Sequence, residues 1–231
     1  MKSILAFGDS LTWGFVPGLF SRHPYEIRWP NALAAALNGQ VRVIEEGLNG
    51  RTTAFDDPTV FEERNGAKAL PMLLSTHQPL DLVIMMLGCN DLKFVSRRRA
   101  FDAHLGMARL VDIVKTFSFL ETSKWPEILI VAPPPLTETD DLFFGHLFND
   151  ALVESRLFAT WYAKIAKDKG VHFFDAGLVC KTSPVDAVHM DAANTRALGV
   201  GLAPAVAAIL DLAAGAHESR DGGGLSLGGK M

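Results

Sequence analysis

The fold of this chain is decided near its start, by the stretch Ile4-Leu5-Ala6-Phe7-Gly8-Asp9-Ser10-Leu11-Thr12. Its four apolar residues have the length of a short buried strand, and Gly8 permits a tight turn directly after them. The stretch therefore predicts a strand whose carboxyl end carries Ser10. A helical turn that starts there has free backbone amides, which favour negative charge close to the serine.

Four further apolar runs of strand length follow, at 41–44, 82–87, 128–132 and 171–174. Near-continuous apolar runs are typical of strands that are buried on both faces, as in parallel sheets. Segments with helical spacing occur at 30–37, 67–76, 99–117, 150–169 and 194–212. This alternation predicts an α/β doubly wound domain around a five-stranded parallel sheet.

One domain is expected over residues 1–214, because no internal repeat or Pro/Gly linker divides them. The segment 215–231 is rich in glycine and is predicted to be a disordered tail without chemistry. The segments 14–29 and 133–149 are long and lack a regular pattern. Segments of this kind usually form lids, pocket walls or subunit contacts.

Charge and composition exclude several classes of partner. The formal net charge is −4, and Arg97-Arg98-Arg99 is the only tight basic cluster. A solvated helix start explains that cluster better than a nucleic-acid site does. The apolar stretch 197–210 contains a proline and is short for a membrane span, so we expect a buried helix there and no membrane partner.

Cysteine content and the first residues indicate the compartment. Only Cys89 and Cys180 are present, which is too few for a disulfide framework and fits a reducing environment. The apolar run after Met1 is too short for a signal-peptide core. We therefore expect a cytoplasmic protein with no metal bound through cysteine.

Polar residues follow several of the predicted strands. Ser10 follows the first, the segment 47–53 the second and Gly88-Cys89-Asn90-Asp91 the third, while Asp186 and His189 lie just before the last helix. Ligands of open parallel sheets bind outside the carboxyl ends of the strands. These segments are therefore predicted to converge on one site.

Ser10 is the candidate nucleophile. A serine in this position is more often a helix cap, and the motif is not the Gly-x-Ser-x-Gly elbow of α/β-hydrolases. His189 can serve as its general base, because Asp186 lies three residues earlier and can reach Nδ1, which leaves Nε2 facing the serine. Asp191 and Asp91 compete with Asp186 for this orienting role.

Two residues are candidate donors to an oxyanion. Gly50 has no Cβ, so its backbone N–H can approach a substrate oxygen closely. Asn90 offers a side-chain amide. Each also has a simpler interpretation, an ordinary glycine turn for Gly50 and an Asx-type turn for Asn90.

Cys89 is a weaker candidate nucleophile, because no cationic partner lies near it in the sequence and buried cysteine is the commoner case. Apolar residues close to the proposed site in sequence are expected to line a pocket, although aromatic and methionine residues are more often core. The expected pocket residues are Leu11, Trp13, Cys89, Phe148, Val188 and Met190.

Together these blocks resemble the SGNH (GDSL) hydrolase family, whose members place a serine, a glycine, an asparagine and a histidine in one site. The matching blocks are Gly8-Asp9-Ser10-Leu11, Asn49-Gly50-Arg51-Thr52-Thr53, Gly88-Cys89-Asn90-Asp91 and Asp186-Ala187-Val188-His189. The resemblance covers residues 2–213. The fuller strings 8–14 and 45–53 are similar to the bacterial arylesterase and acyltransferase branch. Two positions depart from that pattern: many members have a small or hydroxyl residue in place of Cys89, and close relatives can carry alanine in place of Gly50.

This resemblance implies a flavodoxin-like three-layer α/β/α sandwich. It also implies Ser10 as nucleophile, His189 as base, Asp186 as its orienter, and the Ser10 N–H, the Gly50 N–H and the Asn90 amide as oxyanion donors. Members of the branch favour short acyl esters, and some transfer acyl groups to alcohols or peroxide. Many are oligomers with an occluded site, so the resemblance makes 133–149 the segment where we look for a contact between subunits.

The sequence thus predicts a serine esterase that needs no cofactor or metal and acts on a small-molecule ester, in a homo-oligomer. A metal-dependent phosphoesterase is an alternative, because Asp9, Asn90, Asp91, Asp186 and His189 are all hard or borderline metal ligands. That alternative leaves Ser10 and Gly50 without a task. A non-catalytic α/β binding module is the third hypothesis.

Overall fold

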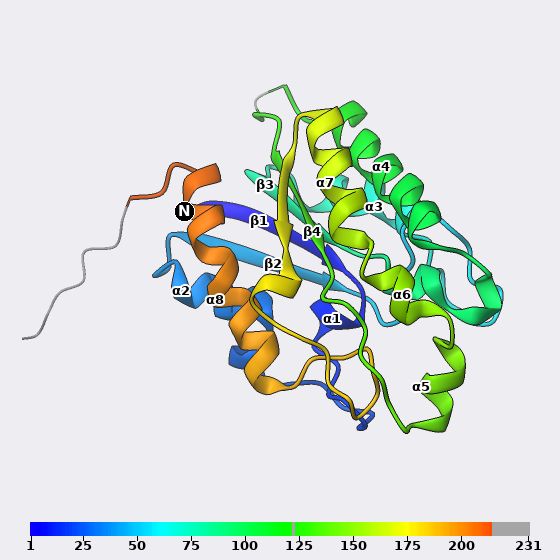
Figure 1. Cartoon of the computed structure of the whole chain (residues 1–231). Coiled ribbons are helices and arrows are strands. Elements are labelled where there is room, and N and C mark those ends of the chain that lie inside the picture. Colours follow the sequence, from blue (N-terminus) through cyan, green and yellow to red (C-terminus); the bar gives the residue numbers. More distant parts are fainter. Residues whose placement is uncertain (122, 214–231) are drawn as a thin grey trace, which may run out of the picture.

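The computed structural model describes residues 1–121 and 123–213 of the 231-residue chain. Its five strands form one parallel sheet in the order β2-β1-β3-β4-β5 (Figure 1). The strands are β1 (Lys2–Gly8), β2 (Val41–Gly47), β3 (Leu82–Met86), β4 (Glu127–Ala132) and β5 (His172–Asp175). This confirms the predicted α/β fold with a five-stranded parallel sheet, while the expected tail at 215–231 lies outside the described residues.

Helices cover the sheet in two groups (Figure 1). One group is α2 (Trp29–Ala36) and α8 (Ala192–Ile209), which pack along each other, and the other is α3 (Gly66–His77), α4 (Ala100–Thr116) and α7 (Phe158–Lys169). By length and composition alone α8 could cross a membrane, but Gly199 lies against the backbone of Trp29 and Leu33 in α2. This contact is what we expect of a helix in the core of a layered domain.

The central strands are buried as the apolar runs predict. Every side chain of β3 and the side chains from Ile4 to Phe7 in β1 are fully inaccessible to solvent. Because helices cover both faces of the sheet, these strands do not alternate between apolar and polar residues.

Two segments differ from the sequence prediction. The predicted helix 150–169 is two helices, α6 (Ala151–Ser155) and α7. Ser155 explains the break, since its hydroxyl donates to Leu152 O and accepts from Leu136 N, and such bonds compete with the helix. The segment 133–149 contains a short helix, α5 (Leu142–Leu147), which Asp141 caps by accepting from the Phe144 N–H at 2.8 Å.

The remaining elements are single turns at the ends of strands and in loops. They are α1 (Ser10–Trp13) and the 3-10 turns η1 (Tyr25–Ile27), η2 (Cys89–Leu92), η3 (Phe94–Ser96) and η4 (Ala176–Leu178).

The strand register places the candidate residues that follow β1, β2 and β3 at the same edge of the sheet. Gly8 pairs with Gly47 of β2 and with Met86 of β3, so these three strands end side by side. A Cβ on Gly8 would lie 2.9 Å from Met86 O, which only glycine avoids. The order 2-1-3-4-5 reverses direction between β1 and β3, and ligands bind in the crevice at such a switch point.

Candidate active site

Ser10 lies at the switch point, in the first position of α1. Asp9 caps this helix, because its Oδ1 accepts from the Leu11 N–H at 2.9 Å. Ser10 itself is only 5% exposed. Its backbone N–H belongs to the first turn of α1, where such groups have no partner within the helix.

Three side chains form a hydrogen-bonded chain across the site. The Ser10 hydroxyl donates to His189 Nε2 across 2.9 Å. The other ring nitrogen, Nδ1, donates to Asp186 Oδ2 across 2.8 Å. Residues that lie 179 positions apart are thereby brought into the arrangement of nucleophile, base and orienting carboxylate.

Asp186 accepts hydrogen bonds on both carboxylate oxygens. Its Oδ1 accepts from the backbone N–H groups of Val188 and His189, and its Oδ2 also accepts from the Gly18 N–H. Burial alone would raise the pKa of Asp186, but the hydrogen bonds and charge of His189, with the backbone N–H groups, outweigh it and lower the pKa below its usual value. The carboxylate is therefore ionised beside His189 at neutral pH.

The turn that holds this pair is locally strained. Ala187 adopts a φ of 70°, in the left-handed region that residues with a side chain seldom occupy. This conformation turns two successive N–H groups toward the Asp186 carboxylate. Such outliers persist where the surrounding structure determines them, often at active sites.

Asp191 and Asp91, the two alternatives to Asp186 as the orienting carboxylate, bind other partners. Asp191 caps α8 by accepting from the Asn194 N–H at 2.8 Å. Asp91 is fully buried and accepts from both the N–H and the hydroxyl of Thr53. Neither carboxylate forms a hydrogen bond with His189 in the part of the chain that the structure describes.

Two aromatic rings contact the His189 imidazole. Phe15 stacks on His189 with ring centroids 4.2 Å apart, and Phe144 meets it edge-on at 5.6 Å. Neither ring was among the expected pocket residues, although both come from the two long segments for which lids, pocket walls or subunit contacts were expected. Exclusion of water by these rings strengthens the electrostatic interactions inside the site.

The backbone N–H groups of Ser10 and Gly50 are two of the expected oxyanion donors, and both residues line one cavity. Gly50 has a φ of 80°, and no backbone carbonyl among the described residues accepts from its N–H or from that of Ser10. A Cβ on Gly50 would lie 3.6 Å from Arg64 Nε and from Lys93 Nζ, which is ordinary contact. Conformation rather than space is thus what favours glycine at this position.

Asn90, in turn η2, lines the same site, and its amide is already engaged. Its Nδ2 donates to Asp9 Oδ2 at 3.2 Å and to the backbone oxygen of Arg51 at 3.1 Å. The Asx-type turn considered for Asn90 would be a bond to its own backbone, whereas these partners come from the turn after β1 and from the loop after β2.

A cavity of about 330 Å³ opens in front of Ser10 and His189. Its wall is mainly apolar and includes five phenylalanines from α5 and from the segments next to it and to α1. The lining residues are Ser10, Phe15, Phe20, Asn49, Gly50, Val60, Arg64, Asn90, Lys93, Phe143, Phe144, Leu147, Phe148, Val188 and His189. Phe148 and Val188, two of the residues expected to line a pocket, are among them.

Four other residues that we expected in the pocket do not line this cavity, and the prediction is corrected for them. Leu11, Cys89 and Met190 are at most 2% exposed and belong to the hydrophobic core. Each is the immediate neighbour of a site residue, and adjacent side chains in a turn or extended segment point in different directions. Trp13 instead packs beneath Arg22, whose guanidinium lies 5.0 Å from its ring.

Cys89 is also unsuited to be a nucleophile. Burial, followed by the negative charges of Asp9 and Asp91, raises the pKa of its thiol well above the ordinary value. A thiol attacks as the thiolate, which is therefore scarce here at neutral pH.

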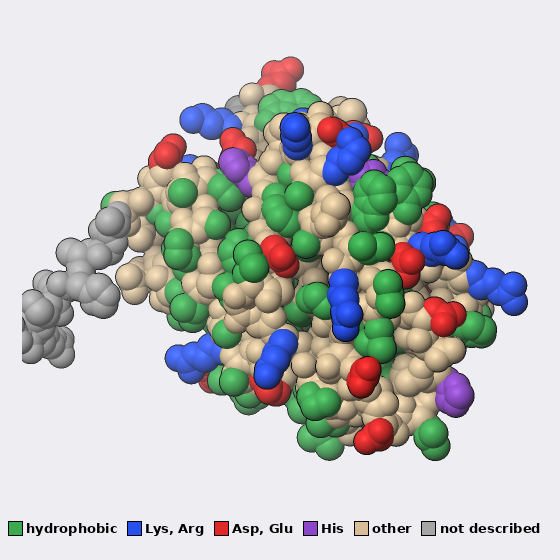
Figure 2. Space-filling view, viewed as in Figure 1, with side chains coloured by type: hydrophobic (Ala, Val, Ile, Leu, Met, Phe, Trp, Pro, Cys, Tyr) green, Lys and Arg blue, Asp and Glu red, His purple; other side chains and the backbone are tan. Residues whose placement is uncertain are grey.

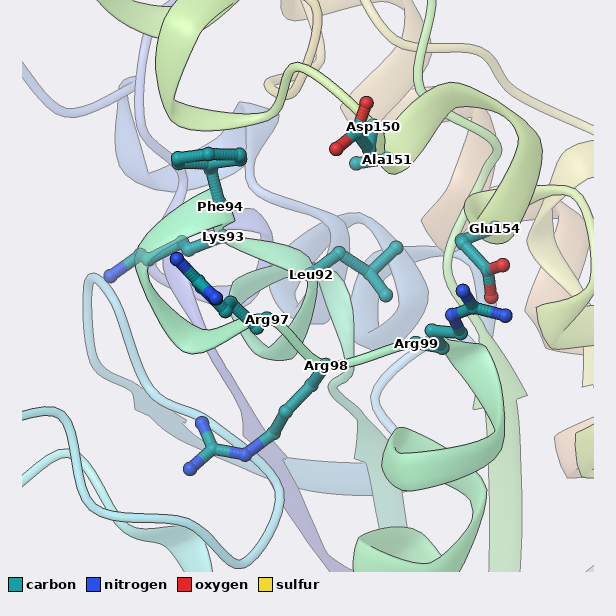
Figure 3. A pocket seen from close by; sticks show the side chains of 9 residues that line it. All are labelled: Leu92, Lys93, Phe94, Arg97, Arg98, Arg99, Asp150, Ala151 and Glu154. Atoms are coloured by element: carbon teal, nitrogen blue, oxygen red, sulfur yellow. The ribbon is translucent and has the colours of Figure 1, made fainter.

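A second cavity, of about 430 Å³, lies beside turn η3 and contains none of Ser10, Asp186 and His189 (Figure 3). Arg97, Arg98 and Arg99 line it, but Figure 3 shows Arg98 pointing away from Arg99. Over the face in Figure 2, acidic and basic side chains are interspersed and no large patch carries a single sign. The arginines thus do not converge on one anion.

The candidate metal ligands are dispersed among other partners. Among residues 1–121 and 123–213, no group of three His, Cys, Asp or Glu side chains is arranged to hold a metal ion. Asp186 accepts a hydrogen bond from His189, and Asp91 accepts one from Thr53. The geometry therefore gives no support to the metal-dependent phosphoesterase.

Comparisons with known proteins agree with this geometry. The model of the GDSL-like lipase/acylhydrolase family matches residues 6–199. A comparison with curated protein sequences finds no match.

Three solved structures are similar over nearly the whole chain. A carbohydrate acetylesterase family member from Sinorhizobium meliloti is 48% identical, with a TM-score of 0.89 over 92% of this chain and 100% of the other. The aryl esterase of M. smegmatis is 45% identical, with a TM-score of 0.87 over 91% and 100%. A putative arylesterase from Agrobacterium tumefaciens is 50% identical, with a TM-score of 0.86 over 91% and 100%.

Proposed function

This chain belongs to the GDSL-like lipase/acylhydrolase family and is a serine esterase, and we propose that it hydrolyses short-chain acyl esters through an acyl-enzyme on Ser10. The observation that carries the proposal is the hydrogen-bonded chain from Ser10 through His189 to Asp186, at the floor of an apolar cavity.

The proposed reaction has two steps. His189 Nε2 takes the hydroxyl proton while Ser10 Oγ bonds to the ester carbonyl carbon, and the carbonyl oxygen becomes an oxyanion. When the oxyanion collapses, the bond to the alkoxy oxygen breaks, and His189 gives its proton to the departing alcohol. A water then attacks the acyl-enzyme in the same way, which releases the acid and restores the Ser10 hydroxyl.

Charge develops on two groups during this reaction. The backbone N–H groups of Ser10 and Gly50 and the amide of Asn90 are the proposed donors to the oxyanion. The ionised Asp186 stabilises the imidazolium of His189 as it forms. No step requires a cofactor.

The cavity favours esters with an apolar acyl or alcohol part. Its phenylalanines offer dispersion contacts and stacking to an aryl group, whereas a polar sugar would leave hydroxyl groups without partners along that wall. Among similar structures, both aryl esterases and carbohydrate acetylesterases occur. We therefore place aryl and short alkyl esters ahead of acetylated sugars.

Acyl transfer to alcohols or peroxide is a second candidate activity of the same site. Phe15 and Phe144 enclose His189, so a less polar acceptor competes better with water for the acyl-enzyme than it would in an open site. The measurement is the ratio of transfer product to acid when an alcohol is added.

We further propose a cytoplasmic homo-oligomer that binds neither nucleic acid nor membrane. Exposed large apolar side chains support association, since Phe20, Phe61 and Leu142 are each at least 79% exposed. Phe20 lines the cavity, and Phe61 and Leu142 each adjoin in sequence a residue that lines it. Light scattering of the purified protein measures the assembly.

The deciding experiment is labelling with a fluorophosphonate, with mapping of the modified peptide. We expect the label on Ser10, and loss of ester hydrolysis in Ser10→Ala but not in Ser75→Ala, which changes an exposed serine of α3. Aryl esters of increasing acyl length then define the preferred substrate. A label on another residue, or an active Ser10→Ala variant, would refute the mechanism.

A further inference from the structure

One buried carboxylate next to the nucleophile has no task in the chain of Ser10, His189 and Asp186. Asp9 precedes Ser10 and is 1% exposed. Its Oδ1 caps α1 through the Leu11 N–H. A cap needs only one oxygen and no charge, since uncharged serine and asparagine cap helices as well as aspartate does. The cap therefore does not explain why a second, charged oxygen is buried here.

The second oxygen reaches the proposed oxyanion donor. Asp9 Oδ2 accepts from Asn90 Nδ2 at 3.2 Å, which links the turn after β1 to the turn after β3. The other hydrogen of Nδ2 goes to the backbone oxygen of Arg51, at 3.1 Å. Arg51 directly follows Gly50, so this one amide joins all three segments that supply oxyanion donors.

Such bonding fixes the orientation of the amide. The terminal torsion of an asparagine side chain is intrinsically broad, and the two acceptors here specify which way Nδ2 points. Both hydrogens are engaged before substrate binds. When an oxyanion forms, one hydrogen must be shared or exchanged with it, while the other bond keeps the amide in place.

The charges around Asp9 are suited to an ionised carboxylate. Burial raises the pKa of Asp9 to about 6. The Leu11 N–H and the charges of His189 and Arg51 act in the opposite direction and lower this pKa. Arg51 is the buried cation of this region, and its Nη1 donates to Gly8 O at 2.8 Å. Asp91, Cys89 and Tyr162 are the other titratable groups near Asp9, and the charge of Asp9 raises the pKa of each of them.

We propose that Asp9 is a positioning residue for ester hydrolysis, whose carboxylate holds the Asn90 amide ready to donate to the oxyanion. The inference rests on the proposed function, in which Asn90 is such a donor. Preorganised donors contribute to the transition state and not to substrate binding, so the loss of Asp9 should lower kcat and leave KM nearly unchanged.

The test is a double-mutant cycle with Asp9→Asn and Asn90→Ala. An asparagine at position 9 cannot accept from both the Leu11 N–H and Asn90, because one of its two polar atoms is itself a donor. We expect Asp9→Asn to lower kcat on an aryl acetate by roughly tenfold to a hundredfold, with KM within about twofold. In the Asn90→Ala background the same change should lower kcat by less than about threefold.

Asp91→Asn is the matched control, since Asp91 is equally buried at the same sheet edge but contacts Thr53 instead of Asn90. Its effect on kcat should be the same in both backgrounds. Asp9→Ser is the second variant, because serine keeps a cap for Leu11 but is too short to reach Asn90. It should reproduce the kcat loss if Asp9→Asn fails to fold.

Equal losses of kcat for Asp9→Asn with and without Asn90, or an effect on KM alone, would overturn the inference. So would a normal kcat in Asp9→Ser. These outcomes differ from failure of the proposed function itself, which would appear as a wild-type protein whose Ser10 does not react with the fluorophosphonate.

Discussion

Replacing Asp186 with asparagine removes one charge from the centre of the site and preserves its shape. Asp186 accepts four hydrogen bonds, two on each oxygen, from Gly18, Val188 and both the backbone and ring of His189. An asparagine accepts on one oxygen only. If that oxygen stays with the Val188 and His189 N–H groups, the new NH₂ faces His189 Nδ1 and forces the ring proton onto Nε2.

The expected loss follows from this change of tautomer. With its proton on Nε2, His189 donates toward Ser10 Oγ, 2.9 Å away, and cannot take the hydroxyl proton. The imidazolium of the transition state also loses its counter-charge at 2.8 Å. In serine proteases the equivalent replacement lowers kcat by roughly 10⁴. We expect a decrease in kcat/KM of about 10³ to 10⁴, or about 4 to 5.5 kcal/mol.

The assay is hydrolysis of an aryl acetate, together with the rate of fluorophosphonate labelling and the thermal unfolding midpoint. Asp191→Asn is the control, because Asp191 lies two residues from His189 but only caps α8, so its kcat/KM should stay within about twofold of wild type. If folded Asp186→Asn retained more than about a tenth of wild-type activity, Asp186 would not be the orienting carboxylate.

Three further predictions concern pH, pocket size and metals. Asp9 and Asp91 have folded-state pKa values of about 6 and about 7 because of burial, so each keeps its proton where the unfolded chain has lost it. The free energy of unfolding should therefore fall as pH rises above about 4, until about pH 6 for Asp9 and about pH 7 for Asp91, by up to about 1.4 kcal/mol per pH unit for each group. Urea titrations across this range should show a smaller slope in Asp91→Asn, and an unchanged slope would contradict the assignment. Phe148→Ala should shift the acyl-length optimum to longer chains and lower the unfolding midpoint, because Phe148 lines the cavity and is 5% exposed; an unaltered length profile would place the acyl group elsewhere. Esterase activity should persist after dialysis against EDTA, and its loss with recovery on adding a divalent cation would favour the phosphoesterase alternative.

Sequence patterns were sufficient to predict those strands and helices whose signal lies in neighbouring residues. Buried strands reveal themselves by apolar runs, and the run 82–87 differs from β3 by one residue. The sequence missed α5, since six residues with a central glycine give too little periodicity, and it missed the break after Ser155, which depends on a contact with Leu136.

For the site, sequence motifs were enough to predict the candidate residues Ser10, Gly50, Asn90, Asp186 and His189. The structure joins Ser10, His189 and Asp186 by hydrogen bonds and places Gly50 and Asn90 in the wall of the same cavity. Only the tertiary structure decided what surrounds them. The stacking of Phe15 on His189, the Gly18 N–H on Asp186 and the link from Asp9 to Asn90 all join segments that are distant in sequence or lack regular pattern. The physical reason is that periodicity and turn chemistry are properties of neighbouring residues, whereas the walls and hydrogen bonds of a site depend on how separate loops meet at the edge of the sheet.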